Sequence, residues 1–457
     1  MPEIYPILLR LRNVLSWTMI RRLHRIVEGM LCLSGRITQL SISRWAGKGG
    51  SYRSVHRFFQ SAIDWSAVSW EFFRSSLYDP QATYILAGDA TVVGKSGKKT
   101  YGVDRFFSST VGKPIPGLAF LEFALVNVES GEAYPLCTDQ VVKSEKEKAQ
   151  ALKRREQRKS TKKVSGRKQA PKRQRGRPAG SKNKNKADVA LSPELARTFS
   201  LGQQLKERIM GTVRVAHVAM DGHYGNNGAC QMARRLGMHL VSKMRSDSEL
   251  YLLPSDDQKR EHPRRKYGAR LDYAHPPEDC RVSSEEADNM RTEVYRMRCR
   301  HKEFADVLNV VVLVKTDLST KRRAHVVLFS TDLDLDAQTL IKYYSLRFQI
   351  EFVFRDAKQH WGLEDFMGVT KRSVDNAVGL SFFMVNLSTY QLAQLRRKVE
   401  QAGVNDLKTY CRGRRYVQEA MKYLPDSPDP IDWERVAERV SLLGFIHAAS
   451  RTRTLRC

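Results

Sequence analysis

The chain lacks several features that mark common classes of protein. Its seven cysteines form no C-x-x-C pair and no cysteine–histidine cluster at zinc-binding spacing, a pattern that fits free thiols in a reducing compartment. No stretch approaches the ~18 uncharged apolar residues of a membrane span, and arginines interrupt the apolar N-terminus, so we expect neither a membrane anchor nor a signal peptide. No Gly-rich Walker loop is present, so we expect no nucleotide cofactor.

Acidic residues are too few to balance the basic ones. The 457 residues include 78 Lys and Arg but only 49 Asp and Glu, a formal net charge of +29. A charge of that size needs a polyanionic partner, and nucleic acid is the first to consider. At 41% hydrophobic residues the chain can still bury a core, so it is not globally disordered.

More than half of the excess charge lies in residues 143–186. This segment holds 19 Lys and Arg and 3 acidic residues, a net charge of +16. Such a run cannot bury enough apolar surface to fold alone, so we predict a disordered arm that contacts nucleic acid. Within it, Arg175-Gly-Arg177-Pro matches the core of an AT-hook, whose arginines enter a narrow A·T-rich minor groove. A linker that binds phosphates without sequence preference is the alternative.

Hydrophobic periodicity divides the rest of the chain into segments. Residues 1–78 are predicted to be helical, either as a small DNA-binding module or as a cap on the next domain. Residues 79–244 alternate strands with helices, which predicts a mixed α/β domain. Residues 245–333 begin with an Arg- and Lys-rich loop and continue as strands, so we predict a β-rich unit. Residues 334–375 and 376–457 are predicted to be helical.

Two aspartates follow apolar strands of the α/β segment. Asp89 comes directly after Tyr84–Gly88, and Asp221 after Val215–Met220. Catalytic groups collect outside strand ends in open α/β sheets. Together with a glutamate from a later helix, these aspartates would form a three-carboxylate cluster, whose hard oxygens suit Mg²⁺ or Mn²⁺. Two such ions activate a water or a 3′-hydroxyl for in-line attack on a phosphodiester.

The helix expected from about Ala337 carries the candidate glutamate. Four polar residues on it project within about 60° of one another if the helix is continuous: Tyr344, Arg347, Glu351 and Lys358. An apolar set falls on the opposite side and is expected to pack: Leu346, Ile350, Val353 and Ala357. The alternative is a solvated face, on which Arg347 and Glu351 make an ordinary i,i+4 ion pair.

The string from Tyr344 to Lys358 resembles a known signature, Y-x2-R-x3-E-x6-K. It is typical of one branch of bacterial insertion-sequence transposases of the DDE superfamily, and the resemblance runs from about Thr83 to Phe366. It implies a ribonuclease H-like catalytic core, formed by residues 79–244 and 334–375. It also implies that the β-rich residues 245–333 are an insertion between the second Asp and the Glu.

The same resemblance implies roles for individual residues. Asp89, Asp221 and Glu351 would be the catalytic triad and would hold two Mg²⁺ ions, with Mn²⁺ as a substitute. The other signature residues would hold DNA phosphates near the cut: Tyr344, Arg347 and Lys358. The basic arm is longer than the family leads us to expect, and the N-terminal segment has no signature that we can match to transposon-end binding.

Other residues are weaker candidates for contacts with DNA. We expect binding by the two hook arginines and by the basic loop of the β-rich unit: Arg175, Arg177, Arg264, Arg265 and Lys266. Trp361 is a candidate for stacking on a flipped base, with packing as the alternative. Phe348 and Phe352 are expected to be buried under the inserted unit. His223 lies close to Asp221, but the sequence offers too few nitrogen or sulfur ligands at zinc-binding spacing to complete a zinc site there, so we expect a structural role for it.

These observations predict a cut-and-paste DNA transposase. It would hydrolyse phosphodiester bonds at transposon ends, and the freed 3′-OH would attack target DNA. Its partners would be double-stranded DNA, as terminal inverted repeats and target, and a second copy in a homodimer on DNA, with the C-terminal helices as the candidate contact. We expect it in the bacterial cytoplasm, at the nucleoid. Two alternatives stay open: a transposase-derived DNA-binding protein that no longer cuts, and a general Mg²⁺-dependent nuclease.

Overall fold

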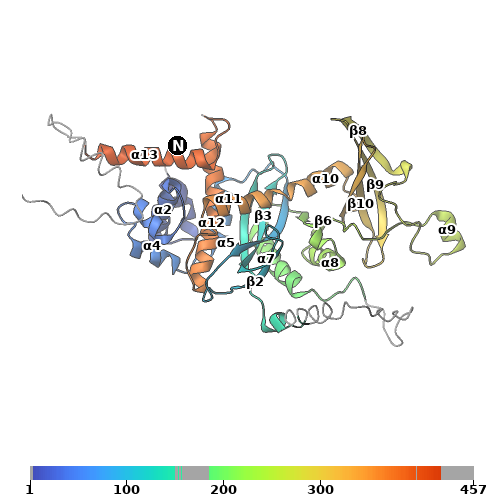
Figure 1. Ribbon diagram of the computed structural model, residues 1–457, viewed down its shortest axis with the longest axis horizontal. Coiled ribbons are helices and arrows are strands. Elements are labelled where there is room, and N and C mark those ends of the chain that lie inside the picture. Colours follow the sequence, from blue (N-terminus) through green and yellow to red (C-terminus); the bar gives the residue numbers. More distant parts are fainter. Residues whose placement is uncertain (1–3, 150–152, 154–155, 157–184, 398, 424–457) are drawn as a thin grey trace, which may run out of the picture.

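The computed structural model describes the chain except residues 1–3, 150–152, 154–155, 157–184, 398 and 424–457. Most of the basic arm, with Arg175 and Arg177, and the end of the C-terminal region therefore lie outside the described residues. The molecule is elongated, with helices at one end, a sheet in the middle and further strands at the other end (Figure 1). In the described part of the chain, no helix is both long and apolar enough to cross a membrane.

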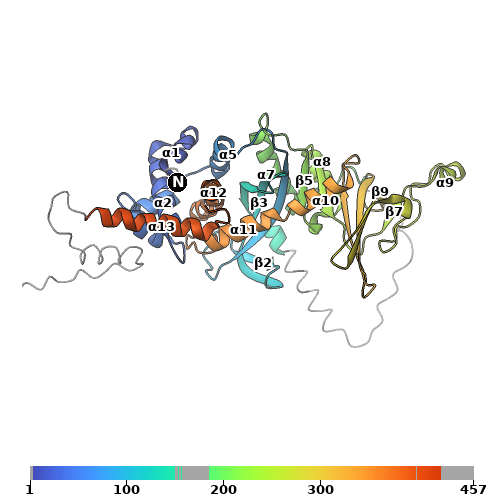
Figure 2. The same cartoon turned by 90° about the horizontal axis from the view of Figure 1, so that it is seen from above.

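The N-terminal segment is helical, as predicted. It contains α1 (Ile4–Leu8), η1 (Leu9–Asn13), α2 (Trp17–Cys32), α3 (Gln39–Trp45), α4 (Tyr52–Phe59) and α5 (Trp65–Ser76). Side chains that accept a backbone N–H begin four of these helices, as expected for Ser, Thr and Asp caps: Ser16, Thr38, Ser51 and Asp64. The helices pack against α12 (Lys371–Leu395) and α13 (Val404–Met421), so the two ends of the described chain share one core (Figure 2).

The middle of the molecule is a mixed α/β unit. Its strands are β1 (Tyr84–Gly94), β2 (Asp104–Ser108), β3 (Lys113–Asn127), β4 (Ala133–Gln140), β5 (His217–Met220) and β6 (His239–Lys243). β1 lies between antiparallel β3 and parallel β5, and β6 is parallel to β5. The helices α7 (Pro193–Ile209) and α8 (Asn227–Arg235) connect the parallel strands. The predicted mixed α/β class is confirmed in this part of the chain.

The β-rich residues continue the same sheet. They form β7 (Leu250–Leu252), α9 (Asp256–Glu261), β8 (Arg281–Ala287), β9 (Met290–His301), β10 (Leu308–Asp317) and β11 (Arg323–Ser330). β11 pairs with β6 over three residues on each strand, from Leu328–Lys243 to Ser330–Val241. The result is one eleven-stranded sheet in the described residues. That residues 245–333 are an insertion stays a prediction, but they are joined edge to edge to the central strands.

Candidate active site

Two carboxylates lie side by side at the centre of the sheet. The register of β1 and β5 pairs Gly88 with Met220, so Asp89 and Asp221 are the next residues on neighbouring strands. Asp221 follows β5 as predicted, and its Oδ1 accepts the backbone N–H of His223 at 3.1 Å. The hydroxyl of Ser242 on β6 donates to the carbonyl of Asp221 at 2.8 Å. The turn that carries Asp221 is thus held from two sides.

Asp89 does not end its strand, contrary to our expectation. β1 continues to Gly94, and Asp89 is paired with Glu122 of β3 in the middle of the ladder. The extension has a physical cause, because Thr91, Val92 and Val93 are β-branched residues that favour a strand. The backbone is therefore fixed by strand pairing both before and after Asp89, and the side chain does not project from a strand terminus.

The signature residues lie on two helices instead of one. α10 (Ala337–Leu346) and α11 (Gln349–His360) are separated by a tight turn at Arg347 and Phe348. In this turn the N–H of Phe348 donates to the carbonyl of Ser345 at 3.1 Å, and the N–H of Glu351 donates to the carbonyl of Phe348 at 3.0 Å. Each bond reaches three residues back, as in a 3₁₀-helix. The predicted apolar side packs as expected in α11, where three residues are buried: Ile350, Val353 and Ala357.

Arg347 contacts two of the carboxylates, one on β1 and one on α11. Its Nη2 lies 3.0 Å from Glu351 Oε1, and its Nη1 lies 3.8 Å from Asp89 Oδ2. The Arg347 side chain is only 12% exposed, and its guanidinium carbon is 5.7 Å from the centre of the Tyr344 ring. The i,i+4 pair exists, with a Glu351 side chain that is 41% exposed, and its Arg347 also reaches Asp89 of β1.

The electrostatics of the site reflect this convergence. The pKa of Asp89 is raised to about 6, mainly by burial and also by the charges of Asp221 and Glu351, against the lowering effects of the Ala90 N–H and of Arg347. Burial also raises the pKa of Tyr344, where Arg347 again opposes the nearby carboxylates. The structure therefore brings Asp89, Asp221, Glu351, Arg347 and Tyr344 to one place.

The carboxylates are not assembled into a ready-made metal cage. Within the described residues, no three or more His, Cys, Asp or Glu side chains are arranged to hold a metal ion. The donor type nevertheless fits a divalent cation, because carboxylate oxygens are hard ligands and the negative charges of Asp221 and Glu351, which raise the pKa of Asp89, are offset by positive charge. Arg347 supplies part of that charge here, through its contacts with Asp89 and Glu351.

Lys358 is held at the far end of α11. Its ammonium donates to the carbonyl of Val92 in β1 at 3.0 Å and lies 3.6 Å from a carboxylate oxygen of Glu364. These contacts fasten α11 to the strand that carries Asp89. An ammonium has three N–H donors, so one more contact is available to it.

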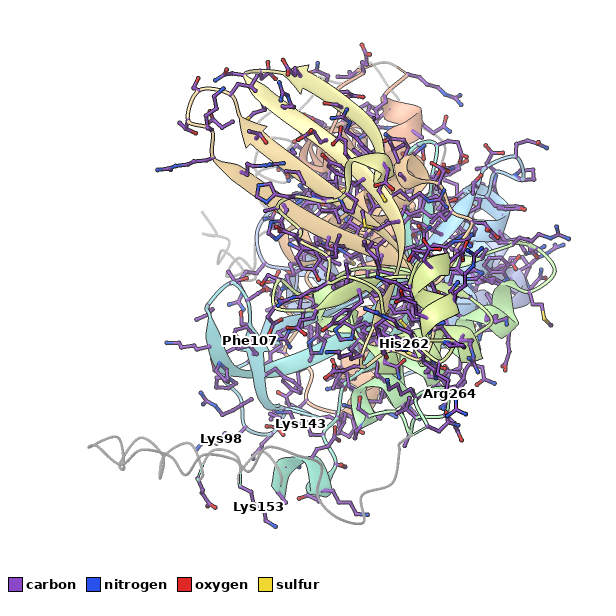
Figure 3. The ribbon with its side chains drawn as sticks, turned by 90° about the vertical axis from the view of Figure 1, so that its right-hand side faces the viewer. Lys98, Phe107, Lys143, Lys153, His262 and Arg264 are labelled. Atoms are coloured by element: carbon purple, nitrogen blue, oxygen red, sulfur yellow. The ribbon has the colours of Figure 1, made fainter. Side chains whose placement is uncertain are left out.

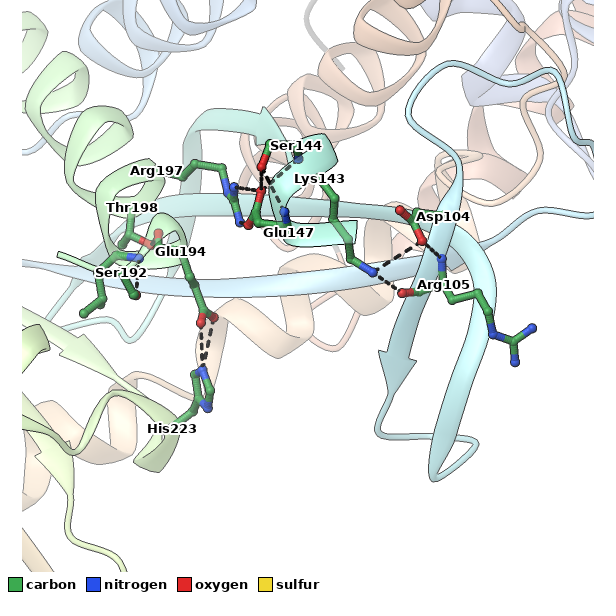
Figure 4. A network of polar contacts seen from close by, with 11 residues as sticks. Asp104, Arg105, Lys143, Ser144, Glu147, Ser192, Glu194, Arg197, Thr198 and His223 are labelled. Atoms are coloured by element: carbon green, nitrogen blue, oxygen red, sulfur yellow. Dashed lines mark hydrogen bonds and ion pairs between the residues drawn. The ribbon is translucent and has the colours of Figure 1, made fainter. Parts of the chain in front are cut away.

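The sequence did not predict one feature beside the site, a histidine–glutamate pair. The Nε2 atom of His223 lies 3.1 and 3.2 Å from the two carboxylate oxygens of Glu194 (Figure 4). This hydrogen bond raises the pKa of His223, and Asp221 and Asp89 add to the effect. The only signals in the sequence were the helix start at Ser192, which places Glu194 in a first turn, and the position of His223 two residues after Asp221.

Some weaker predictions need correction. Trp361 is 1% exposed, with the ammonium of Lys408 lying 5.0 Å from its ring centre. Its ring is enclosed in the core, so stacking on a base is not available to it. Phe348 and Phe352 are exposed instead of buried and contact each other edge to face. The reason is that the β-rich residues extend the sheet sideways and do not cover α11.

The basic loop of the β-rich residues is remote from the carboxylates. Its three cations are exposed: Arg264, Arg265 and Lys266. The loop follows α9 at the end of the molecule opposite the helices (Figure 1), and Arg264 is on the end face that Figure 3 presents. Contact with DNA by this loop stays a prediction, and such a contact would be distant from the cut.

A buried glutamate lies on the strand next to the one that carries Asp89. Glu122, the cross-strand partner of Asp89, is completely buried. Its Oε1 accepts the N–H of Cys137 at 3.2 Å, and the Thr138 hydroxyl donates to its Oε2. Burial raises the pKa of Glu122 well above its usual value, because these two hydrogen bonds do not replace the hydration of a charged carboxylate.

Glu122→Gln is expected to be more stable than wild type, by a difference that grows as the pH rises above about 4.5, the ordinary pKa of Glu. Folded Glu122 holds its proton more tightly than the unfolded chain does, so wild-type stability is full at low pH and falls as pH rises, by at most about 1.4 kcal/mol per pH unit. Gln cannot ionise and escapes this loss. Urea unfolding of both proteins from pH 4 to 8, in EDTA, measures the difference. The control, Glu285→Gln on exposed β8, should follow wild type; a Glu122→Gln difference that does not change with pH would contradict the prediction.

A family model described as DDE superfamily endonuclease matches residues 10–303. The matched range includes Asp89 and Asp221, but it ends before α10 and α11, so Arg347 and Glu351 lie beyond it. No curated protein matches the sequence.

Proposed function

The chain belongs to the DDE superfamily of endonucleases, and from this premise we propose that it is a cut-and-paste DNA transposase. The observation that carries the proposal is the convergence of three carboxylates: Asp89 from β1 and Glu351 from α11 meet at the guanidinium of Arg347, and Asp221 after β5 lies beside Asp89. Three carboxylates from three separate elements have no structural need to meet, whereas phosphodiester chemistry needs such a cluster.

The fold and the signature support a particular branch of the superfamily. Antiparallel strands β1 and β3 followed by the parallel strands β5 and β6 fit the ribonuclease H-like core that the resemblance implies. The Y-x2-R-x3-E-x6-K residues border the cluster, which favours the insertion-sequence branch. On this interpretation, residues 245–333 are the insertion that separates Asp221 from Glu351 in the sequence.

We propose that Asp89, Asp221 and Glu351 hold two Mg²⁺ ions, with Mn²⁺ as a substitute. When bound, the ions lower the pKa of the attacking water or 3′-hydroxyl and stabilise the leaving oxygen. The raised pKa of Asp89 means that the site binds metal in competition with protons. Arg347 keeps the carboxylates close together by offsetting their mutual repulsion.

The chain's own residues orient the DNA in two successive reactions. In hydrolysis, a water oxygen bonds to phosphorus, the P–O3′ bond breaks, and a 3′-hydroxyl and a 5′-phosphate result. In strand transfer, that 3′-hydroxyl bonds to a target phosphorus and releases a target 3′-hydroxyl. Arg347 and Tyr344 bind phosphate oxygens beside the carboxylates, and Lys358 offers its remaining N–H from the end of α11.

The decisive experiment is a cleavage assay on DNA that carries the inverted repeats flanking the gene. Wild-type protein with Mg²⁺ is expected to cut at the repeat boundary, and Asp221→Asn is expected to bind the same DNA without cutting it. Cutting without preference for the repeats would favour a general nuclease. Binding without cutting by wild type, in both Mg²⁺ and Mn²⁺, would favour a DNA-binding protein that has lost catalysis.

The remaining expectations about partners follow from this proposal. Joining two transposon ends needs two active sites, so we propose a homodimer assembled on DNA, with the exposed side of α13 in the C-terminal region as the candidate contact. The basic arm, with Arg175 and Arg177, and the loop with Arg264, Arg265 and Lys266 would add phosphate contacts away from the cut.

A further inference from the structure

A β-hairpin projects from the central sheet on the side of the basic arm. β2 pairs with the start of β3 from Asp104–Gly117 to Ser108–Lys113. Its four-residue loop closes with a 2.8 Å hydrogen bond from the N–H of Gly112 to the carbonyl of Ser108, and Gly112 has a φ of +66°. Figure 4 shows this hairpin extending beyond the strands that carry the site.

The hairpin and the loop before it expose an unusual combination of side chains. Phe107 is 63% exposed and Val111 is also exposed near the tip. Among the described residues, Lys98, Lys99 and Lys113 form no ion pair and are exposed to solvent. Figure 3 shows Phe107 and Lys98 on the same side of the molecule. An exposed aromatic ring on the same side of the molecule as an unpaired cation is suited to a polyanion that also offers apolar surface.

The base of the hairpin is held rigidly. The one acidic residue of the hairpin, Asp104, is 3.4 Å from the ammonium of Lys143, which also lies 4.5 Å from the centre of the Phe106 ring (Figure 4). In the loop before β2, the ammonium of Lys95 donates to the carbonyls of Glu364 and Phe366, which follow α11. The only carboxylate is thus neutralised, and the hairpin needs little ordering when it binds, which favours affinity.

The hairpin is directly connected to the catalytic strand. Glu122 of β3 pairs with Asp89, and Lys113 lies nine residues further toward the tip of the hairpin. At roughly 3.4 Å per residue, Lys113 at the start of β3 is about 30 Å along the strand from the position paired with Asp89. The rise of B-DNA is also about 3.4 Å per base pair, so this reach corresponds to about nine base pairs.

We propose that the β2–β3 hairpin is a DNA-contact element, which binds the duplex within about nine base pairs of the cut. Phe107 and Val111 contact sugars and base edges in a groove, while Lys98, Lys99 and Lys113 contact the phosphates on either side. The proposal rests on the proposed function, because it takes double-stranded DNA as the substrate. The net charge of +29 argues against a second copy of the chain as the occupant.

Photo-crosslinking tests where the hairpin lies on DNA. In full-length protein, Phe107→p-benzoylphenylalanine is expected to crosslink to an end-labelled repeat within about nine base pairs of the cut. The matched control is Val282→p-benzoylphenylalanine, since Val282 is 53% exposed on β8 but stands next to Arg281, which pairs with Glu278 and Glu293. This control is expected to give little or no crosslink to DNA.

A second measurement tests the cations. The triple variant Lys98→Gln/Lys99→Gln/Lys113→Gln is expected to make the fall of log affinity with log salt less steep. The magnitude of the slope should decrease by about 2 to 3, at about 0.9 per lost phosphate contact. Lys315→Gln, an exposed lysine on β10, should leave the slope unchanged.

The possible outcomes separate this inference from the proposed function. If wild type binds the repeats but Phe107 crosslinks no better than Val282, or crosslinks to a second protein chain, the hairpin inference is overturned and the transposase proposal stands. If wild type does not bind DNA at all, the proposed function itself fails.

Discussion

Glu351→Gln is expected to abolish DNA cleavage while DNA binding stays at the wild-type level. The substitution removes one carboxylate charge and keeps the shape of the side chain, so α11 should fold as before. A lost metal ligand removes several kcal/mol of transition-state stabilisation, which corresponds to a fall of about 10³-fold or more in the cleavage rate. Single-turnover cleavage of the repeat substrate and a gel shift on the same preparation measure the two properties separately.

A matched control for this variant lies on the same helix. Asp356 is also acidic and bonds to its neighbour Arg355 at 3.0 Å, away from Asp89. Asp356→Asn should therefore leave cleavage close to wild type. Undiminished cleavage by Glu351→Gln would remove Glu351 from the triad, a useful result because Glu351 lies beyond the range that the family model matches.

Removing residues 150–184 is expected to weaken DNA binding more than any point substitution. This part of the arm contains 15 Lys and Arg and one Glu, a net charge of +14. If roughly half of those cations neutralise phosphates, the log–log salt slope should fall by about 6, and affinity at 0.2 M salt by several orders of magnitude. Fluorescence anisotropy at a series of salt concentrations measures both quantities.

The boundaries of this deletion follow from contacts at the two ends of the arm. Lys143 holds Asp104 of the hairpin, and Glu147 forms two hydrogen bonds with Arg197 of α7, so both residues are kept (Figure 4). Lys186 bonds to the carbonyl of Lys302 and is kept as well. A Gly/Ser segment of equal length replaces the arm, so that only charge is lost. An unchanged salt slope would show that the arm does not touch phosphates.

The same assay separates the two interpretations of the AT-hook motif. The double variant Arg175→Ala/Arg177→Ala removes only two charges, so a phosphate-binding linker predicts a slope change of about 2 and equal losses on all DNA. A sequence-preferring hook predicts a larger loss on A·T-rich DNA than on G·C-rich DNA.

The sequence predicts the main site residues because local signals mark them. Asp89 and Asp221 each follow an apolar run in the sequence, and the spacing of Tyr344, Arg347 and Glu351 is helical; the structure brings all five together, although their roles stay predictions. The tight turn between Leu346 and Gln349 could not be predicted, because no Gly or Pro marks it.

Residues whose position depends on tertiary structure escaped prediction for a different reason. Glu194 reaches His223 only because the fold brings the first turn of α7 close to the turn after β5, and Glu122 is paired with Asp89 only through the register of β1 and β3. The burial of Trp361 likewise depends on helices from both ends of the chain. None of these arrangements leaves a pattern within a short stretch of sequence.

The short seam between β6 and β11 has a mechanical consequence. Lys243, Ser242 and Val241 pair with the outer strands, and Ser242, the middle residue, also holds the carbonyl of Asp221. This hydrogen bond links the β6–β11 seam to the backbone of the turn that carries Asp221. If the proposed contact between DNA and the outer loop strains these strands, the strain reaches that turn through Ser242. Load on the distant loop and the alignment of the proposed cutting site are therefore coupled through one strand.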